Sequence, residues 1–411
     1  MPLQIVATRP DPALVTLPWQ TPLEDWADSV LVPLPRGISR HVVRFVRLGE
    51  HIYAVKETRE RIALGEYRLL RDLRRLALPA VEPVGVVTGR ATTEGEPIEP
   101  VLVTRHLNYS LPYRALFSRG LRTDTAPRLV DALVVLLTRL HLAGFFWGDC
   151  SLSNTLFRRS AGAFAAYLVD AETGELHDQL SPGQRAYDLD IATSNLFGEI
   201  LDLQAGGFLD ESLDAHETIA MLSRRYQELW VELTEAEEFG TGEMWHIEQR
   251  IRRLNDLGFD IDELDIVTDW DGATVRIQPK VVDAGHHSRR LQGLTGLDVE
   301  ENQARRLLND LDAYAAANGL QGESAPIVAH AWLTDIFEPV VAMVPPGLRG
   351  KLEPAEIFHE ILEHRWYLSE RAGGEVEIFQ ATRSYVDDVL RTKPDTELTP
   401  PISPDEADLS Q

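Results

Sequence analysis

The segment from His141 to Glu172, HLAGFFWGDCSLSNTLFRRSAGAFAAYLVDAE, contains the residues best suited to chemistry in this chain. Asp149 is followed five residues later by Asn154, and a short apolar run then ends at Asp170. Phosphoryl transfer from a metal–nucleotide needs such a set, because Asp149 could accept the proton of an attacking hydroxyl while Asn154 and Asp170 ligate Mg²⁺. Oxygen ligands suit this hard cation, and phosphate and water complete its shell.

An upstream pair, Lys56 and Glu66, has the residue types of a phosphate-binding site. Lys56 lies near the end of a predicted strand, YAVKE, and Glu66 lies within a predicted helix from about Thr58 to Leu76. A compact ammonium suits a phosphate oxygen and a single carboxylate better than a guanidinium does, and only four of the 40 basic residues are lysines. We therefore expect Lys56 to pair with Glu66 and to contact the phosphates. The alternatives are Glu60 as the partner, or a solvated strand end without a role.

The segment PRGIS has groups that could bind phosphate oxygens. Gly37 is its one glycine, and Ser39 with nearby backbone N–H groups could bind phosphate oxygens. Arg36 and Arg40 are alternative phosphate ligands. These arginines could equally belong to a solvated basic face.

Predicted strands and helices place these side chains. Runs of β-branched and aromatic residues predict strands within residues 31–57 and 81–107, separated by the helix that carries Glu66. A long apolar helix, APRLVDALVVLLTRLHLAG, precedes Asp149, and FAAYLV is a strand that ends at Asp170. A further helix is expected from about Tyr187. The predicted fold class is therefore α+β.

Composition and turn signals divide the chain into four parts. Trp19 and Trp26 are expected to anchor a Pro-rich leader on the first domain, and Gly240-Thr241-Gly242 marks the boundary to a mixed, mainly helical domain. That second domain has a β-hairpin signal at Asp271-Gly272. The acidic, Pro-rich end of the chain predicts disorder. The parts are the leader, residues 1–29; the candidate catalytic domain, 30–240; the C-terminal domain, 241–392; and the tail, 393–411.

Lys56, Glu66, Asp149, Asn154 and Asp170 occur in the order found in the protein-kinase-like superfamily, which about residues 31–230 resemble. The form HxxGxxWGD, which ends at Asp149, looks closer to small-molecule kinases, such as the lipopolysaccharide core (Kdo/heptose) kinases, than to typical protein kinases. The whole chain looks like an actinobacterial family that joins a lipopolysaccharide-kinase-like domain to a C-terminal domain of unknown function.

The resemblance implies a bilobal domain with a small β-rich lobe, residues 30–107, and a helical large lobe, residues 108–240. It implies an interlobe hinge that includes Thr104 and His106, whose backbone would pair with an adenine edge. It also implies Glu172 as a further metal ligand. Asp188 and Asp190 are placed like the aspartate that braces the catalytic loop in such folds, although both also suit a helix N-terminus.

The expected function is therefore an ATP- and Mg²⁺-dependent phosphotransferase acting on a hydroxyl. Asp149 is the expected base, Asn154 and Asp170 the metal ligands, and Lys56 with Glu66 the phosphate clamp. A sugar, a glycolipid precursor, a small metabolite and a protein side chain all stay open as acceptor. The alternative is a pseudokinase that binds nucleotide without catalysis and recognises a protein partner through its C-terminal domain.

Composition limits the partners and the compartment. The net charge of −25 over 411 residues argues against nucleic acid as a partner, because there is no surplus of cations to displace counterions. The single cysteine, Cys150, permits no intramolecular disulfide and fits a reducing cytoplasm. The N-terminus has no signal-peptide pattern, and no run approaches the roughly 20 apolar residues of a transmembrane helix. We expect a soluble cytoplasmic protein.

Overall fold

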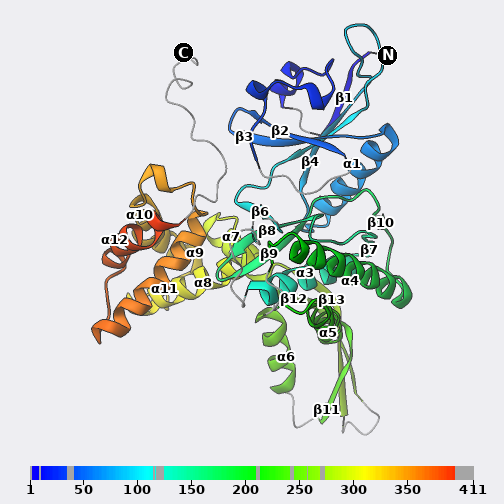
Figure 1. Ribbon diagram of the computed structural model, residues 1–411. Coiled ribbons are helices and arrows are strands. Elements are labelled where there is room, and N and C mark those ends of the chain that lie inside the picture. Colours follow the sequence, from blue (N-terminus) through cyan, green and yellow to red (C-terminus); the bar gives the residue numbers. More distant parts are fainter. Residues whose placement is uncertain are drawn as a thin grey trace. The chain divides into compact units, whose positions relative to one another are not determined.

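The computed structural model describes residues 2–8, 11–34, 41–113, 116, 125–209, 213–240, 245–256, 258–268 and 274–393. The described chain is a mixed α+β structure made of two compact units, which Figure 1 shows with their elements labelled. Unit 1 holds the described residues up to 158 and residues 166–223, whereas unit 2 holds residues 159–165 and 224–393. The sequence-based boundary near residue 240 stays a prediction, and the predicted disordered tail lies, except for Lys393, outside the described residues.

An antiparallel five-stranded sheet forms the N-terminal part of unit 1, in the order β1-β4-β5-β3-β2. The register places Lys56 opposite Val43 on one side and Leu102 on the other, so the lysine lies on an interior strand. Gly49 makes the tight turn between β2 and β3 with a φ of +57°, a conformation that glycine adopts without strain. The strands are β1 (Gln4–Ala7), β2 (Val42–Leu48), β3 (His51–Glu57), β4 (Glu82–Thr88) and β5 (Val101–Arg105).

One strand of this sheet comes from the predicted leader. The prediction of a strand that starts at Leu31 is wrong, since Leu31 makes only an isolated bridge to Val46. Instead β1 pairs with β4 and completes the sheet. The short 3-10 helices that follow β1 pack on the sheet, and Trp19 and Trp26 are buried among its apolar residues. These helices are η1 (Pro12–Thr16), η2 (Leu23–Asp25) and η3 (Asp28–Val30).

Helix α1 (Glu60–Arg75) packs against β4 and β5 of the sheet, as Figure 1 shows. Its apolar face is buried at Ala63, Tyr67, Leu70 and Leu73. Leu76, the last residue of the predicted helix, is 46% exposed, because the helix ends one residue earlier. Glu66 lies on the buried face and is 2% exposed, so its carboxylate needs a partner inside the protein.

The remainder of unit 1 consists of short strands and two long helices. The apolar helix predicted before Asp149 is α3, and the predicted strand before Asp170 is β9. Helix α4 begins earlier than the predicted Tyr187, because Ser181 and Gln184 form a capping box with a proline at the first helical position. The elements are β6 (Ser110–Pro112), α3 (Thr125–Leu142), β7 (Phe145–Phe146), β8 (Thr155–Ser160), β9 (Ala163–Leu168), β10 (Glu175–Leu176) and α4 (Pro182–Ala205).

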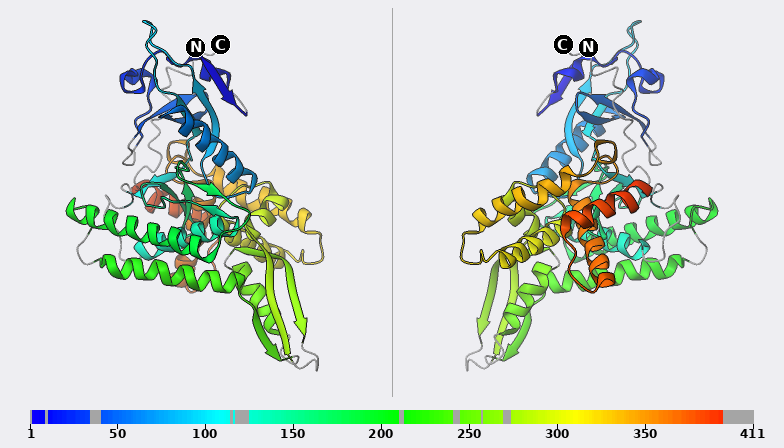
Figure 2. Two further views of the ribbon diagram at one scale, coloured as in Figure 1. Left: turned by 90° about the vertical axis from the view of Figure 1, so that its right-hand side faces the viewer. Right: turned by 90° about the vertical axis from the view of Figure 1, so that its left-hand side faces the viewer.

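Helix α5 (Ala215–Thr234) leads from unit 1 into unit 2, which begins with a three-stranded antiparallel sheet in the order β11-β13-β12. Its strands are β11 (Glu237–Gly240), β12 (Phe259–Thr268) and β13 (Thr274–Ala284). Strands β12 and β13 form the predicted hairpin, although its turn lies outside the described residues. Figure 2 shows this long ribbon with helix α6 (Trp245–Asp256) beside it.

The C-terminal helices of unit 2 surround one apolar core. Its largest members include Trp332, Phe337 and Phe358, whose rings contact one another at centroid distances of 5.2 to 5.8 Å. No helix of the described residues is long and apolar enough to cross a membrane. The helices are α7 (His286–Thr295), α8 (Glu301–Ala317), α9 (Ala325–Trp332), a π-helical turn (Leu333–Phe337), α10 (Glu338–Ala342), α11 (Pro354–Ala372) and α12 (Ile378–Asp388).

The Arg90 guanidinium, whose side chain is fully buried, joins the leader to the sheet. It donates to the carbonyls of Trp19 and Thr21 at 3.1 and 2.7 Å and pairs with Glu57 at 2.5 Å. We expect Arg90→Met to lower the free energy of unfolding by about 3 kcal/mol, because Glu57 and the leader carbonyls lose their shared donor. Urea denaturation measures this, with exposed Arg68→Met as the control. Equal stability of the two variants would show that Arg90 does not hold the leader.

Candidate active site

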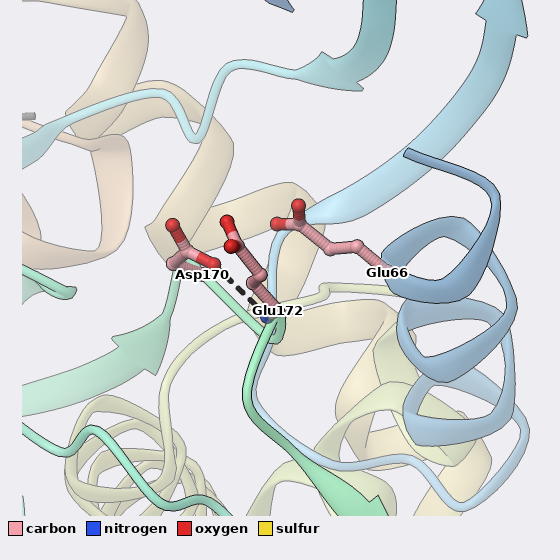
Figure 3. A group of neighbouring side chains, drawn as sticks. All are labelled: Glu66, Asp170 and Glu172. Carbon is pink, nitrogen blue, oxygen red and sulfur yellow. Dashed lines mark hydrogen bonds between the residues drawn. The ribbon is translucent and has the colours of Figure 1, made fainter. Parts of the chain in front are cut away.

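Lys56 brings together parts of unit 1 that are far apart in the sequence. Its Nζ lies 3.0 Å from Glu66 Oε2 on α1, and 2.7 and 3.5 Å from the carboxylates of Asp170 and Glu172 after β9. Figure 3 shows the three carboxylates turned toward one another, with the Glu172 N–H bonded to Asp170 Oδ1 at 2.9 Å. The partner of Lys56 on α1 is therefore Glu66 rather than Glu60.

This cluster holds more negative than positive charge. Burial and the neighbouring Asp170 carboxylate raise the pKa of Glu66 to about 8, although Lys56 opposes this shift. Burial disfavours the charged form of Lys56, but Glu66 and Asp170 outweigh it and hold the pKa of Lys56 above its ordinary value. Oxygen atoms of Glu66, Asp170 and Glu172 all lie within 4.8 Å of one another. Three carboxylates around one ammonium therefore favour the binding of a further cation.

His41, which the sequence analysis did not single out, lies at the edge of the cluster. Its Nε2 is 3.0 Å from Glu172 Oε2. The predicted phosphate loop, with Gly37 and Ser39, immediately precedes His41 and lies outside the described residues. The entry of the chain into β2 is thus next to Glu172, while the loop itself stays a prediction.

The Asp149 carboxylate is oriented by two side-chain amides. Asn154 Nδ2 donates to Asp149 Oδ2 and to the Asp149 carbonyl, both at 3.0 Å. Asn195 Nδ2, from α4, donates to Asp149 Oδ1 and to the Cys150 carbonyl, both at 3.1 Å. Because each carboxylate oxygen has its own amide donor, the carboxylate is fixed in orientation.

Helix α4 also holds the backbone of the loop around Asp149. Asp188 is fully buried and accepts from the N–H groups of Trp147 and Gly148 at 2.7 and 2.8 Å, and His141 Nε2 lies 3.1 Å from it. Asp190 is exposed, so of the two candidates Asp188 braces the loop. Glu199 accepts from the N–H groups of Leu152 and Ser153 at 2.6 and 2.9 Å.

Two contacts join this loop to the segment that carries Asp170. The fully buried Trp147 donates from its indole Nε1 to the Asp170 carbonyl at 2.9 Å. The Asn154 carbonyl accepts from the Val169 N–H at 3.0 Å. The structure therefore brings Asp149, Asn154 and Asp170 to one place.

The predicted hinge leaves the sheet at Arg105. Thr104 is buried in β5, where it pairs with Ala54 and Pro83. The His106 N–H donates to the Ile52 carbonyl at 2.8 Å. Within the described residues, the His106 carbonyl and the Leu107 N–H have no hydrogen-bond partner.

The sequence analysis missed Asn195 and Glu199. Both lie on the helix that carries Asp188, and the spacings of seven and four residues place all three on one helical face. The sequence did contain a signal for them, because three polar residues lie on one face of a helix that was expected to pack against the domain. It did not reveal the partner of each side chain, because that depends on contacts between distant segments.

Comparisons with known proteins find a family match in the C-terminal part of the chain. Residues 228–390 match the family described as "Domain of unknown function (DUF4032)", which agrees with the expected C-terminal domain of unknown function. A search of curated proteins finds no match. A solved structure titled "WaaP in complex with acyl carrier protein" is similar at 17% identity and a TM-score of 0.33, over 56% of this chain and 100% of that chain. A TM-score this low does not establish a shared fold.

The bracing role of Asp188 can be measured through stability. We expect Asp188→Ala to lower the free energy of unfolding by about 3 kcal/mol, because buried N–H donors of the loop lose their acceptor. Asp190→Ala, on the same helix but exposed, should change it by less than about 0.5 kcal/mol. Chemical denaturation of both variants makes the comparison. A loss shared equally by the two would contradict the bracing role.

A pH dependence follows from His106, because burial lowers its pKa to about 4. In the unfolded chain, His106 binds a proton near pH 6.5, whereas in the folded protein it stays neutral down to about pH 4. The free energy of unfolding therefore falls as the pH is lowered from about 6.5 to 4. We expect this loss, at most about 1.4 kcal/mol per pH unit, to be smaller in His106→Gln. Unfolding of both proteins across pH 4 to 7.5 isolates the contribution of His106. Parallel curves would show that its pKa is not lowered.

Proposed function

We propose that this chain is an ATP- and Mg²⁺-dependent phosphotransferase with a kinase-like bilobal domain, and that it transfers a phosphoryl group to a hydroxyl. The observation that carries the proposal is the contact of Lys56 with both Glu66 and Asp170. The segment that carries Asp170 is in turn bonded to the loop in which the Asp149 carboxylate is fixed. Phosphoryl transfer depends mainly on the positioning of charged groups, and a lysine held by a helix glutamate beside a metal-binding aspartate is its recurring arrangement.

The donor set fits Mg²⁺. Asp170 and Glu172 offer carboxylate oxygens, and the Asn154 amide nitrogen is engaged by Asp149, which leaves its oxygen as the atom offered to a cation. These are hard oxygen ligands, which suit Mg²⁺ better than softer metals. When bound, the ion neutralises phosphate charge and holds the phosphates in place.

The side chains of the protein have separate roles in the proposed reaction. Lys56 contacts the phosphate oxygens of the nucleotide, and Glu66 holds Lys56 in position. Asp149 accepts the proton of the acceptor hydroxyl as its oxygen attacks the γ-phosphorus and the bond to the β-phosphate oxygen breaks. Asn154 and Asn195 keep the Asp149 carboxylate oriented toward that hydroxyl.

The hinge offers a place for the base of the nucleotide. The His106 carbonyl is an acceptor and the Leu107 N–H a donor, which complement the amino group and a ring nitrogen of adenine. Thr104 contributes to the sheet from which the hinge leaves rather than to these polar groups. Gly37 and Ser39 remain proposed phosphate contacts.

Calorimetric titration with ATP, in the presence and absence of Mg²⁺, tests the nucleotide site without knowledge of the acceptor. We expect Mg²⁺-dependent binding that weakens by about tenfold or more in Asp170→Asn, because the metal ligand at this position loses its negative charge. Asp178→Asn, an exposed aspartate of the same segment, is the matched control and should bind as the wild type. Binding that ignores Mg²⁺ would indicate a nucleotide-binding pseudokinase instead. Absence of binding would overturn the proposal.

A further inference from the structure

The hairpin of β8 and β9 connects the proposed metal ligands with the C-terminal domain. β8 starts one residue after Asn154, and β9 ends two residues before Asp170. The tip of the hairpin, residues 159–165, belongs to unit 2, although the rest of the hairpin belongs to unit 1. Unit 2 also contains the whole segment that matches the family of unknown function, residues 228–390.

Two buried polar residues of unit 2 hold the backbone of the tip. Glu356 Oε2, on α11, accepts from the Ala161 N–H at 2.8 Å. Gln303 Nε2, on α8, donates to the Arg159 carbonyl at 3.1 Å and to Glu356 Oε2 at 3.0 Å. Glu356 and Gln303 are 3% and 0% exposed. A buried carboxylate is costly unless donors surround it, so these hydrogen bonds define one position for the tip.

The turn itself has a conformation that the sequence disfavours. Ala161 and Gly162 connect the strands with φ values of +48° and +79°. Such two-residue turns favour asparagine or aspartate at the first position, because a Cβ is strained in the left-handed region. A non-glycine residue persists there when its surroundings fix it, and the bond to Glu356 does so here.

We infer that Glu356 and Gln303 are positioning residues for the proposed active site, and that this is one role of the C-terminal domain. The inference rests on the proposed function for its effect on nucleotide binding. Because the Asn154 carbonyl is bonded to the Val169 N–H, the open end of the hairpin sets the spacing of Asn154 and Asp170. Fixing the tip restricts the twist and slide of both strands, and so restricts the two metal ligands.

Three variants of α11 test this inference. Glu356→Ala removes the acceptor, Glu356→Gln keeps an acceptor oxygen at the same place, and Glu370→Ala removes an exposed carboxylate from the same helix. Hydrogen exchange across residues 155–168 reports the hairpin, and calorimetry reports the Kd for Mg·ATP. We expect Glu356→Ala to speed exchange over the whole hairpin and to weaken Mg·ATP binding, each by roughly tenfold. Glu356→Gln should restore both, and Glu370→Ala should change neither.

The two measurements separate this inference from the proposed function. In Glu356→Ala, exchange that rises only at the tip or does not rise would overturn the positioning role. An unchanged Kd for Mg·ATP in this variant would overturn it as well. If the wild type binds no Mg·ATP, the proposed function fails. Hydrogen exchange at residues 155–158 and 166–168 of Glu356→Ala then decides by itself whether the tip controls the two strands. If Glu356→Ala does not fold, both measurements are made on Gln303→Ala, which removes the hydrogen bond to the Arg159 carbonyl.

Discussion

The largely buried ammonium of Lys56 is the group on which the site depends. It lies among carboxylates from α1 and from the segment after β9, so an interior strand, a helix and a loop meet at one charge. A buried charge without partners is costly, and none of these elements can move away without leaving its carboxylate or the lysine unpaired. Packing brings the elements near one another, whereas this cluster fixes which residues face each other.

The second constraint is the polar face of α4. Asp188 and Glu199 accept backbone N–H groups of the loop, while Asn195 orients the Asp149 carboxylate. A reaction that consists mainly of positioning requires such support, because little reorganisation can then occur when charge develops. The hairpin that follows Asn154 extends this support into unit 2 through Glu356, which ties the proposed chemistry to a domain without an assigned role.

Local patterns explain most of the agreement between sequence and structure. The runs of β-branched and aromatic residues in β2 and β3, the 3.6-residue period of α1 and the apolar run of α3 depend on neighbouring residues, so these elements could be predicted. The errors lie where another part of the chain decides. A strand was placed at Leu31, but β4 pairs instead with β1, which lies in the predicted leader. The start of α4 was placed too late because the capping box at Ser181 was overlooked.

The sequence by itself determined the kinds of chemistry available: a rare lysine on a strand, a glutamate on the next helix, and Asp149, Asn154 and Asp170 in a fixed order. Order and residue type suffice for this, because catalytic groups are recognised by their functional groups and the elements that carry them. Only the tertiary structure decided that Glu66 rather than Glu60 reaches Lys56 and that Asp188 rather than Asp190 braces the loop. It also decided that Asn195 bonds to Asp149 and that Glu356 bonds to Ala161. These pairings span from 10 to 195 residues of sequence, and no local pattern encodes which distant donor will meet a given acceptor.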